Sequence, residues 1–471
     1  MATDSLPARP HPAVLQDALT RANWSARQLV KTVNPRLNAM GHPAVDITAG
    51  YKWLRGHVPR SAAVRDVVVA VLSEASGHRY TSTEMWGSGY PSAEVTQTGE
   101  TEELLGPLPL EAVLRTASAW TSGTVEPALV QSTADEKLTA AVWDATRQAP
   151  ARLLTGRRNG EFVAPEFVDM LFEQLAALRR LDDRTGGGPL SQRQARHALH
   201  DSLGLIHDGQ YTAATGTRLL QCAAGAAQLA GWMSFDAGLA PASHRYQLLA
   251  IRIARAVGDT MTVSNALGML AYQHAADGNP NLALRFAYAA VEHARGALPL
   301  VQARAWGRLA TAQAAAGNLD GFRRATDQSR RLIQNRHADD PPSLYYLTPQ
   351  QINAESGQAL VDLAAHIPGK RTLLLREAAA LLSPIADQGP STGFRRSGIL
   401  HGIHLVRASI GARDPEATAH WITALADHVP HIQSIRCRTL LTAVRTRASN
   451  PLRTAGRADA LEAISKALSS A

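Results

Sequence analysis

Glycine-containing turns recur at regular intervals in the second half of this chain. Gly238, Gly278 and Gly317 follow one another about 40 residues apart, a period typical of stacked helical repeats. The segments 208–211 and 411–415 have the same turn-like composition. Because one helix pair cannot bury its apolar face alone, this period predicts successive helix pairs stacked into a continuous array.

The composition favours helices over strands along the whole chain. Hydrophobic residues make up 45% of the 471 residues and aromatic residues only 5%, and the dominant alanine and leucine favour helix over strand. A chain of this length is too long for one hydrophobic core. The sequence therefore predicts an all-α protein with a small N-terminal domain followed by the repeat array.

The first ninety residues contain start and stop signals for several helices. A first helix is expected over 12–23. Ser25 and Gln28 form an S-x-x-Q capping box that begins a second helix, and Pro35 is expected to disturb or end its regular part. Asp46 is the predicted N-cap of a third helix over 47–55.

Gly56 and Pro59 are expected to end that third helix and close its exit turn. Ser61 is the predicted cap of a fourth helix. The apolar stripe of this fourth helix consists of Val64, Val67, Val68, Val71 and Leu72. This spacing places the stripe on one helix face, which is expected to face a core.

Positive charge is concentrated in the same region. Between Trp24 and Arg60 six residues are basic, whereas Asp46 is the only acidic residue. The net charge of the whole chain is +8, so much of the surplus lies in this short segment. A compact basic unit suits the phosphate backbone of DNA, which supplies most non-specific affinity.

The run 46–59 resembles the recognition helix and exit turn of the Cro/repressor-like (XRE) helix-turn-helix. The residues that match the family pattern are Trp53, Arg55, Gly56 and Pro59. Two features depart from it: the connection between the second and third helices is longer, and Gly50 stands where an apolar residue is expected. Gly50 also lowers helix propensity by about 1 kcal/mol.

The resemblance extends over most of the chain. The segments 33–60, 180–188, 229–238 and 244–246 resemble actinomycete regulators that join such a motif to TPR-like repeats. The resemblance implies a helix-turn-helix domain followed by a TPR-like α-superhelix. It also implies a transcriptional regulator of development or secondary metabolism.

The resemblance also implies which residues contact double-stranded DNA. The expected base contacts are Thr48, Ala49, Tyr51 and Lys52. The expected phosphate contacts are Ser25, Arg27, Arg55, His57 and Arg60. A small helical bundle whose charges only face solvent is the alternative interpretation.

The rest of the chain divides into four segments. Residues 87–109 are rich in Gly, Ser, Thr, Pro and Glu and are expected to be a linker. Helical patterns resume at 110–120, 135–146 and 165–181 within a connecting region over 110–190. The repeat domain is expected over 191–450 and a C-terminal tail or helix over 451–471. The first domain is expected over 10–86.

The stretch 180–188, with sequence RLDDRTGGG, is predicted to be a loop between helices. Contact with a small molecule or partner is the alternative for it. The concave side of such an array usually holds a ligand or protein. The candidate residues for an effector or partner groove are Trp232, Tyr246, Arg252, Tyr272, His274, Arg285 and Trp306.

Motifs for catalysis or metal binding were sought and not found. His197 with His200, and His401 with His404, share helix spacing without a third ligand, so both pairs are expected on helix surfaces. Cys222 and Cys437 are expected to be buried free thiols in a reducing compartment. We therefore expect no enzyme activity, no cofactor, no metal and no membrane span, and a soluble cytoplasmic protein.

Two functions remain open on these grounds. The first is a homodimeric DNA-binding regulator, in which the repeat domain supplies dimerisation and receives a peptide, small-molecule or protein effector. The second is a TPR-like interaction scaffold whose degenerate helix-turn-helix does not bind DNA. The long connection after the second helix and Gly50 favour the second.

Overall fold

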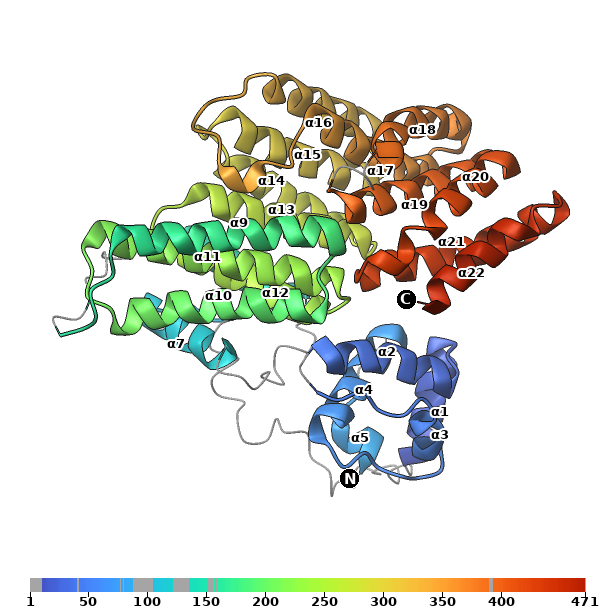
Figure 1. The fold of residues 1–471 in the computed structure, drawn as a ribbon, viewed down its shortest axis with the longest axis horizontal. Coiled ribbons are helices and arrows are strands. Elements are labelled where there is room, and N and C mark those ends of the chain that lie inside the picture. The colour runs from blue at the N-terminus through green and yellow to red at the C-terminus, as the bar shows by residue number, and fades with distance from the viewer. Residues whose placement is uncertain are drawn as a thin grey trace, which may run out of the picture.

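The computed structural model describes residues 11–39, 42–76, 78, 80–87, 105–121, 135–150, 156, 159–388 and 393–470. Within these ranges the chain is helical, apart from one isolated parallel bridge between Phe162 and Gln210. The expected all-α class is therefore confirmed for the described residues (Figure 1). Most of the expected linker 87–109 lies outside them.

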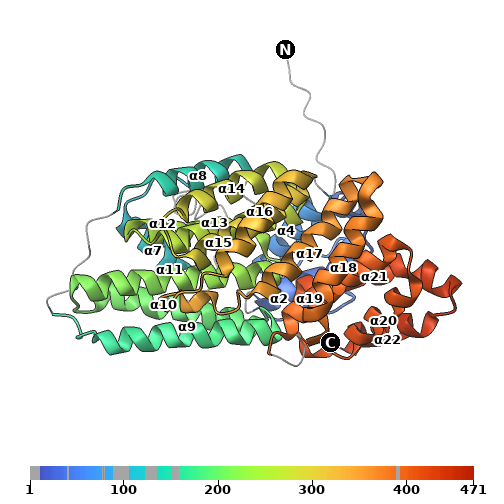
Figure 2. The same ribbon diagram turned by 90° about the horizontal axis from the view of Figure 1, so that it is seen from above.

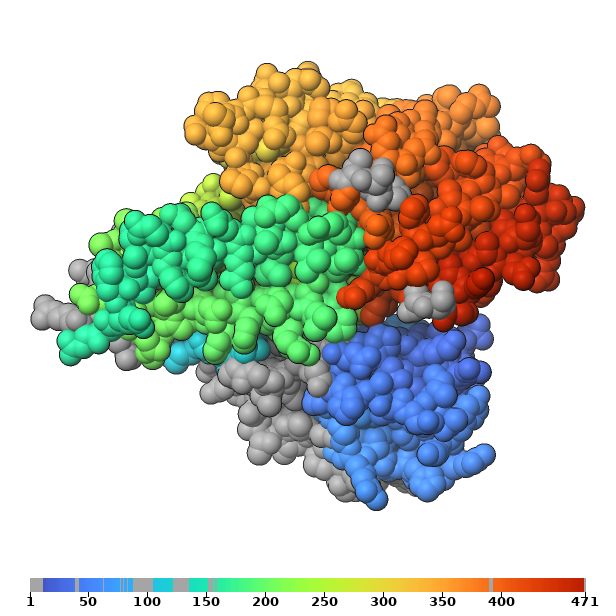
Figure 3. Space-filling model, in the orientation of Figure 1, coloured from blue at the N-terminus to red at the C-terminus, as the bar shows by residue number. Residues whose placement is uncertain are grey.

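Five short helices build the N-terminal unit, which forms a separate lobe in the space-filling view (Figure 3). They are α1 (His11–Ala22), α2 (Ala26–Ala39), α3 (Ala49–Leu54), α4 (Ala62–Ser76) and α5 (Ser82–Trp86). The predicted valine stripe of α4 is buried, as expected, and packs against Leu15, Leu29 and Trp53. The unit thus has a hydrophobic core of its own.

The sequence predicted that Pro35 would disturb or end the regular part of the second helix; the helix does not end there but continues to Ala39. A proline inside a helix removes one backbone hydrogen bond. Val33 and Leu37, on either side of it, are fully buried in the core of the unit, and this packing keeps the helix continuous. Tertiary burial outweighs the local preference here.

The third helix begins at Ala49, two residues later than expected. Asp46 still organises its start, because its carboxylate accepts hydrogen bonds from the backbone and the hydroxyl of Thr48. These bonds lower the pKa of Asp46. Gly56 ends the helix with a positive φ of 93°, as predicted.

The repeat region starts with three helices that the sequence located closely. They are α7 (Leu110–Thr121), α8 (Asp135–Arg147) and α9 (Pro165–Thr185). The helices that follow are α10 (Pro189–Asp208), α11 (Ala213–Asp236), α12 (Ala240–Ala256), α13 (Thr260–Ala276), α14 (Pro280–His293), α15 (Pro299–Ala315), α16 (Leu319–Ile333), α17 (Pro349–His366), α18 (Arg371–Gln388), α19 (Arg395–Ala412), α20 (Pro415–Ala426), α21 (Ile435–Thr454) and α22 (Ala458–Ser470).

Successive helices from α10 onward pack against their neighbours in the chain, and alternate helices α11, α13, α15, α17 and α19 also contact one another (Figures 1 and 2). This is the arrangement of a repeat α-superhelix. The predicted turns at Gly238, Gly278 and Gly317 are confirmed, each with a positive φ between 72° and 76°. The segments 208–211 and 411–415 also lie at helix–helix turns.

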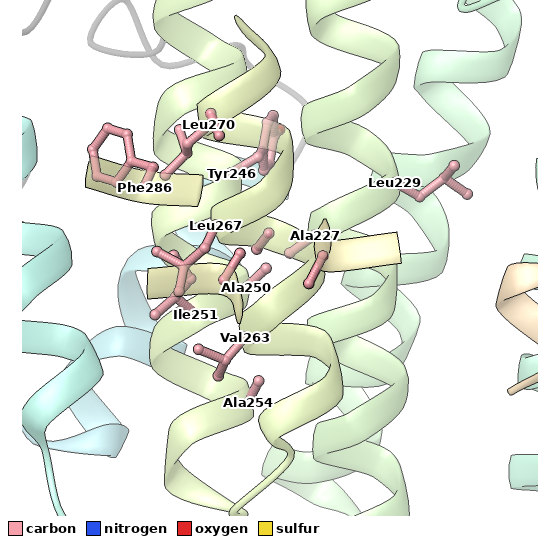
Figure 4. Close-up of a cluster of buried hydrophobic side chains, with 14 of the residues drawn as sticks. Ala227, Leu229, Tyr246, Ala250, Ile251, Ala254, Val263, Leu267, Leu270 and Phe286 are labelled. Carbon is pink, nitrogen blue, oxygen red and sulfur yellow. The ribbon is translucent and has the colours of Figure 1, made fainter. Parts of the chain in front are cut away.

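Small side chains allow these helices to approach closely. In the core of α11 to α14, Ala227, Ala250 and Ala254 lie between larger residues such as Leu267 and Phe286 (Figure 4). Cys222 and Cys437 are buried and free, as predicted. The helices α19 to α22 form a further hydrophobic cluster around Ile403 and Leu441.

The histidines 401 and 404 are not on a helix surface, which corrects the prediction from their spacing. Both are buried, with 1% and 3% of their surface exposed. Burial lowers the pKa of His401 to about 4 and that of His404 well below its usual value. His197 and His200 are exposed on α10, as expected. Among the described helices, none has the length and apolar character needed to cross a membrane.

The stretch 180–188 is not a free loop. Helix α9 continues to Thr185, so Asp182 and Asp183 lie in its last turns. Arg396 from α19 reaches back and pairs with Asp182 at 3.1 Å and with Asp183 at 3.3 Å. The backbone N–H of Gln433 donates to the carbonyl of Thr185 at 2.6 Å. The segment therefore joins α9 to the C-terminal helices.

Gly186, Gly187 and Gly188, which we call the glycine junction, follow α9 and allow it to approach α11 and the C-terminal helices closely. A Cβ on Gly187 would lie 2.6 Å from the carbonyl oxygen of Met233 in α11. The backbone N–H of Gly187 donates to Asp236 at 3.1 Å, and Ser434 donates to the same carboxylate at 2.8 Å. Only glycine fits between these backbones.

We therefore expect Gly187→Ala to lower the free energy of unfolding by about 1–3 kcal/mol, because the new methyl group must displace the backbone of α11. Urea unfolding of the full chain measures this change. The matched control is Gly204→Ala in α10, where a Cβ meets nothing within 4 Å and should increase stability by up to about 1 kcal/mol. Equal effects of the two substitutions would contradict the packing described for the junction.

Candidate DNA-binding face and ligand cavity

The N-terminal unit presents an exposed basic face around α3. Of the predicted base contacts, Thr48, Tyr51 and Lys52 are exposed, and 46% of the Tyr51 surface is accessible. Ala49 is buried against the core of the unit and has little surface to offer a ligand. The predicted phosphate contacts Ser25, Arg27, Arg55, His57 and Arg60 are all exposed.

Gly50 has a structural reason to be a glycine. Helix α3 crosses the first residue of α2 so closely that a Cβ on Gly50 would clash with the carbonyl oxygen of Ala26. The side chain of Asn34 holds the connection between these two helices by accepting from the N–H of Val45 and donating to its carbonyl, both at 2.8 Å. The two helices are therefore held together tightly.

The start of α2 is capped as the sequence predicted. The Ser25 hydroxyl accepts a hydrogen bond from the backbone N–H of Gln28 at 3.1 Å. Because Ser25 and Arg27 are both exposed, the positive end of this helix and a guanidinium group share one surface. This combination favours an anion.

A second candidate site is a cavity inside the superhelix, partly open to solvent. The alternate helices α9, α11, α13, α15, α17 and α19 contribute its wall, together with the turn at 343–346. The cavity therefore lies on the inner face of the array. Its charged lining residues are Arg179, Asp182, Asp183, Arg304, Arg308, Glu355 and Arg396.

One end of the cavity contains the carboxylates of α9. The indole N–H of Trp232 donates to Asp182 at 2.9 Å, the hydroxyl of Tyr345 donates to Asp183, and Arg396 contacts both carboxylates. Burial raises the pKa of Asp182 to about 7, and the nearby Asp236 adds to this rise. The charge of Arg396 opposes this rise.

Another carboxylate of the cavity, Glu355, has a lowered pKa, whereas that of Asp182 is raised. Glu355 accepts two hydrogen bonds from Arg304, at 2.9 and 2.5 Å, and one from Gln351 at 3.1 Å. Burial alone would raise the pKa of Glu355, but the charges of Arg304 and Arg308 outweigh it and lower the pKa well below its usual value. Glu355 therefore stays ionised.

Aromatic rings also line the cavity and contact its arginines. The guanidinium group of Arg308 lies 4.5 Å from the ring centre of Tyr272, and that of Arg396 lies 5.3 Å from Trp232. The hydroxyl of Tyr272 accepts from Gln358 at 3.0 Å and from Arg436. Cations stacked on rings are attracted to the π-electrons, which fixes the orientation of both partners.

Of the seven predicted groove residues, Trp232 and Tyr272 line the cavity, and the other five do not. Trp306 packs on the main core. Of the remaining four, three contact α7 or α8, which cover another side of the array, and His274 contacts α12. These contacts are Tyr246 with Trp120, Arg252 with Asp144, His274 with His244, and Arg285 with Trp143.

Sequence reasoning missed most of the cavity lining. Arg304 and Arg308 are four residues apart in a helix that is otherwise rich in alanine. A pair of cations on the same face of a mostly apolar helix was the available signal. Glu355, 51 residues from Arg304, could not be connected with it from the sequence.

No protein-family model matches this chain, and a search of curated proteins finds no match.

The first prediction from these sites concerns Gly50. Gly50→Ala improves helix propensity by about 1 kcal/mol, yet we expect it to destabilise the N-terminal unit, because its methyl group overlaps the Ala26 carbonyl oxygen. Hydrogen exchange of the amides of α2 to α4 in the full chain measures the effect, and faster exchange is expected. Gly369→Ala, where a Cβ meets nothing within 4 Å, is the control. Unchanged or slower exchange in Gly50→Ala would contradict the close crossing.

The second prediction concerns the pH dependence of stability. The pKa of His401 is about 4, lowered by burial, and about 6.5 in the unfolded chain. Below pH 6.5 the unfolded chain binds the additional proton, so His401 lowers stability as the pH falls from about 6.5 to 4.

We expect His401→Gln to remove this contribution. The difference in unfolding free energy between the wild type and the variant should change by about 1.4 kcal/mol per pH unit between pH 6 and 4. Urea unfolding at several pH values measures it. His197→Gln, at an exposed position of α10, is the control and should leave the pH dependence unchanged. A difference independent of pH would mean that His401 is not held neutral by burial.

Proposed function

We propose that this protein is a sequence-specific DNA-binding transcriptional regulator and that α2 and α3 form its helix-turn-helix. The observation that carries the proposal is the exposed face formed by Tyr51, Lys52, Arg55 and Arg60 on and after α3. A single short helix with a basic, partly aromatic face, held firmly against a second helix, suits the major groove.

The phosphate contacts extend this face on both sides. Arg27, at the capped start of α2, and His57, in the exit turn of α3, are exposed. Such contacts supply affinity and orientation, whereas Thr48 and Lys52 supply base readout. No carboxylate of the described residues forms an ion pair with Arg27, Lys52, Arg55 or Arg60, so these charges are free for phosphate groups.

In this proposal the TPR-like repeat region receives an effector in its inner cavity and supplies the contacts of a homodimer. A dimer with one helix-turn-helix per subunit requires two half-sites about 10 base pairs apart, or a multiple of that spacing. The resemblance to actinomycete regulators supports a cytoplasmic regulator of development or secondary metabolism. The proposal involves no catalytic step.

One observation favours a second candidate function, an interaction scaffold that does not bind DNA. Helix α3 contains only six residues, and the connection before it is longer than in the standard motif. In that case the N-terminal unit and the repeats would serve only to hold a protein partner.

Binding to the promoter region of its own gene distinguishes the two functions. We expect salt-sensitive, sequence-selective binding by the full chain. In Lys52→Ala/Arg55→Ala the affinity should fall, and the slope of log affinity against log salt should become shallower by about 2, because two charges no longer displace counterions. Fluorescence anisotropy at two or more salt concentrations measures both quantities.

The control is Lys370→Ala/Arg371→Ala, which removes the same charges from an exposed part of the repeat region. It should leave both affinity and slope unchanged. Absence of DNA binding at low salt would exclude the regulator and favour the scaffold. An equal effect of the two double variants would mean that DNA is attracted only by the total charge.

A further inference from the structure

Arg179 in α9 differs from the other arginines of the cavity. It lines the cavity and lies over the backbone of α11, where a Cβ on Gly225 would be 3.4 Å from its Nη2. Arg304 and Arg396 both pair with carboxylates. Among the described residues, none accepts a hydrogen bond from Arg179 or forms an ion pair with it. Its guanidinium group is therefore a cation without a counter-ion.

The surroundings of Arg179 are poor in compensating charge. Burial lowers the pKa of Arg179, and the groups that oppose this shift are Cys222, Tyr345 and Tyr346, none of which is a carboxylate. Buried charges in proteins are normally paired, because an unpaired one loses its hydration without compensation. An unpaired arginine at a cavity wall therefore indicates a partner supplied from outside.

Arg308 is only partly compensated in the same cavity. Its Nη1 is 4.0 Å from Glu355, whose two oxygens already accept from Arg304. Its Nη2 contacts the sulfur of Met269 at 3.6 Å, and its buried Nε has no hydrogen-bond partner. Burial and the charge of Arg304 lower the pKa of Arg308. The cavity thus contains a second cation with spare donors.

The charge balance of the lining indicates the charge of the missing partner. Four arginines and three carboxylates line the cavity, and because burial raises the pKa of Asp182, at least one positive charge remains uncompensated. His401, also in the lining, is neutral at pH 7 because burial lowers its pKa to about 4. An anionic ligand offsets this surplus. The planar fork of a guanidinium group matches a carboxylate in geometry as well as charge.

We propose that the cavity binds an organic carboxylate, with Arg179 pairing with the carboxylate group and Leu229, Trp232 and Met261 contacting the ligand body. Arg308 supplies further donors. The carboxylate belongs either to a small organic acid or to the C-terminus of a short peptide, whose body would lie along the partly open cavity. The inference rests on the proposed effector role of the repeat region, but its test involves no DNA.

The first experiment uses the protein without ligand. Arg179→Met removes an unpaired, partly buried charge and keeps an unbranched but shorter side chain, so it should raise the midpoint of thermal unfolding by about 2 °C or more. Arg304→Met, the matched control, leaves Glu355 without its two hydrogen bonds and should lower the midpoint. A lower midpoint in Arg179→Met would show a purely structural role and overturn the proposal.

The second experiment measures thermal unfolding with four probes at matched ionic strength. They are benzoate, benzamide, N-acetyl-trileucine with a free C-terminus, and the amide of the same peptide. We expect at least one acid to raise the midpoint of the wild type while its amide does not, and Arg179→Met to lose this response. A response to benzoate alone assigns a small acid, and a response to the peptide acid alone assigns a peptide C-terminus.

Three results overturn the proposal: neither acid stabilises the wild type at high concentration, the amides stabilise it equally, or the response persists in Arg179→Met. A protein that binds these acids but not DNA would retain the carboxylate site and lose the proposed regulator function. A protein that binds DNA but none of the acids would retain the function and lose the site.

Discussion

The ion pair between Arg396 and the two aspartates of α9 holds α9 and α19, two helices far apart in the sequence, together. Arg396 is 5% exposed and belongs to α19, more than 200 residues from Asp182 in the sequence. Loop closure over such a distance costs conformational entropy, which only specific contacts between the ends can offset. The glycine junction and Asp236 supply these contacts from the backbone side. This contact places α9 and α19 side by side in the wall of the inner cavity.

The same closure explains why the cavity can hold so many charges. A buried ion pair is favourable only when its geometry is good and its remaining donors are satisfied. Arg304 and Glu355 meet this requirement through two hydrogen bonds, and Arg396 meets it through two carboxylates and the ring of Trp232. Arg179 has neither a carboxylate partner nor a hydrogen-bond acceptor among the described residues. The contrast within one cavity separates the charges that stabilise the fold from the charge that is available to a ligand.

The fold was predictable from the sequence to a large extent, whereas the cavity was not. Apolar stripes and turn glycines are local signals, and for that reason the fourth helix and the turn at Gly278 were correctly located. The lining of the cavity depends on which face of each helix the superhelix turns inward. Tyr246 and Tyr272 have similar sequence surroundings, yet one lies under α7 and the other in the cavity. Arg252 shows the same limit, because its charge is matched by Asp144, which is 108 residues away.

The path from the cavity to the N-terminal unit is short. Helix α9 carries Arg179, Asp182 and Asp183, packs against α10, and α10 contacts α2 (Figure 1). A ligand in the cavity changes the position of α2 only if it binds two arrangements of these helices with different affinities. An unpaired cation in α9 provides such a difference, because its charge is compensated only when the ligand is close to that helix. Under the proposed carboxylate binding, the arrangement that brings α9 closest to the ligand is the one that binding would stabilise, and the contacts of α10 with both helices would connect a change in α9 to α2.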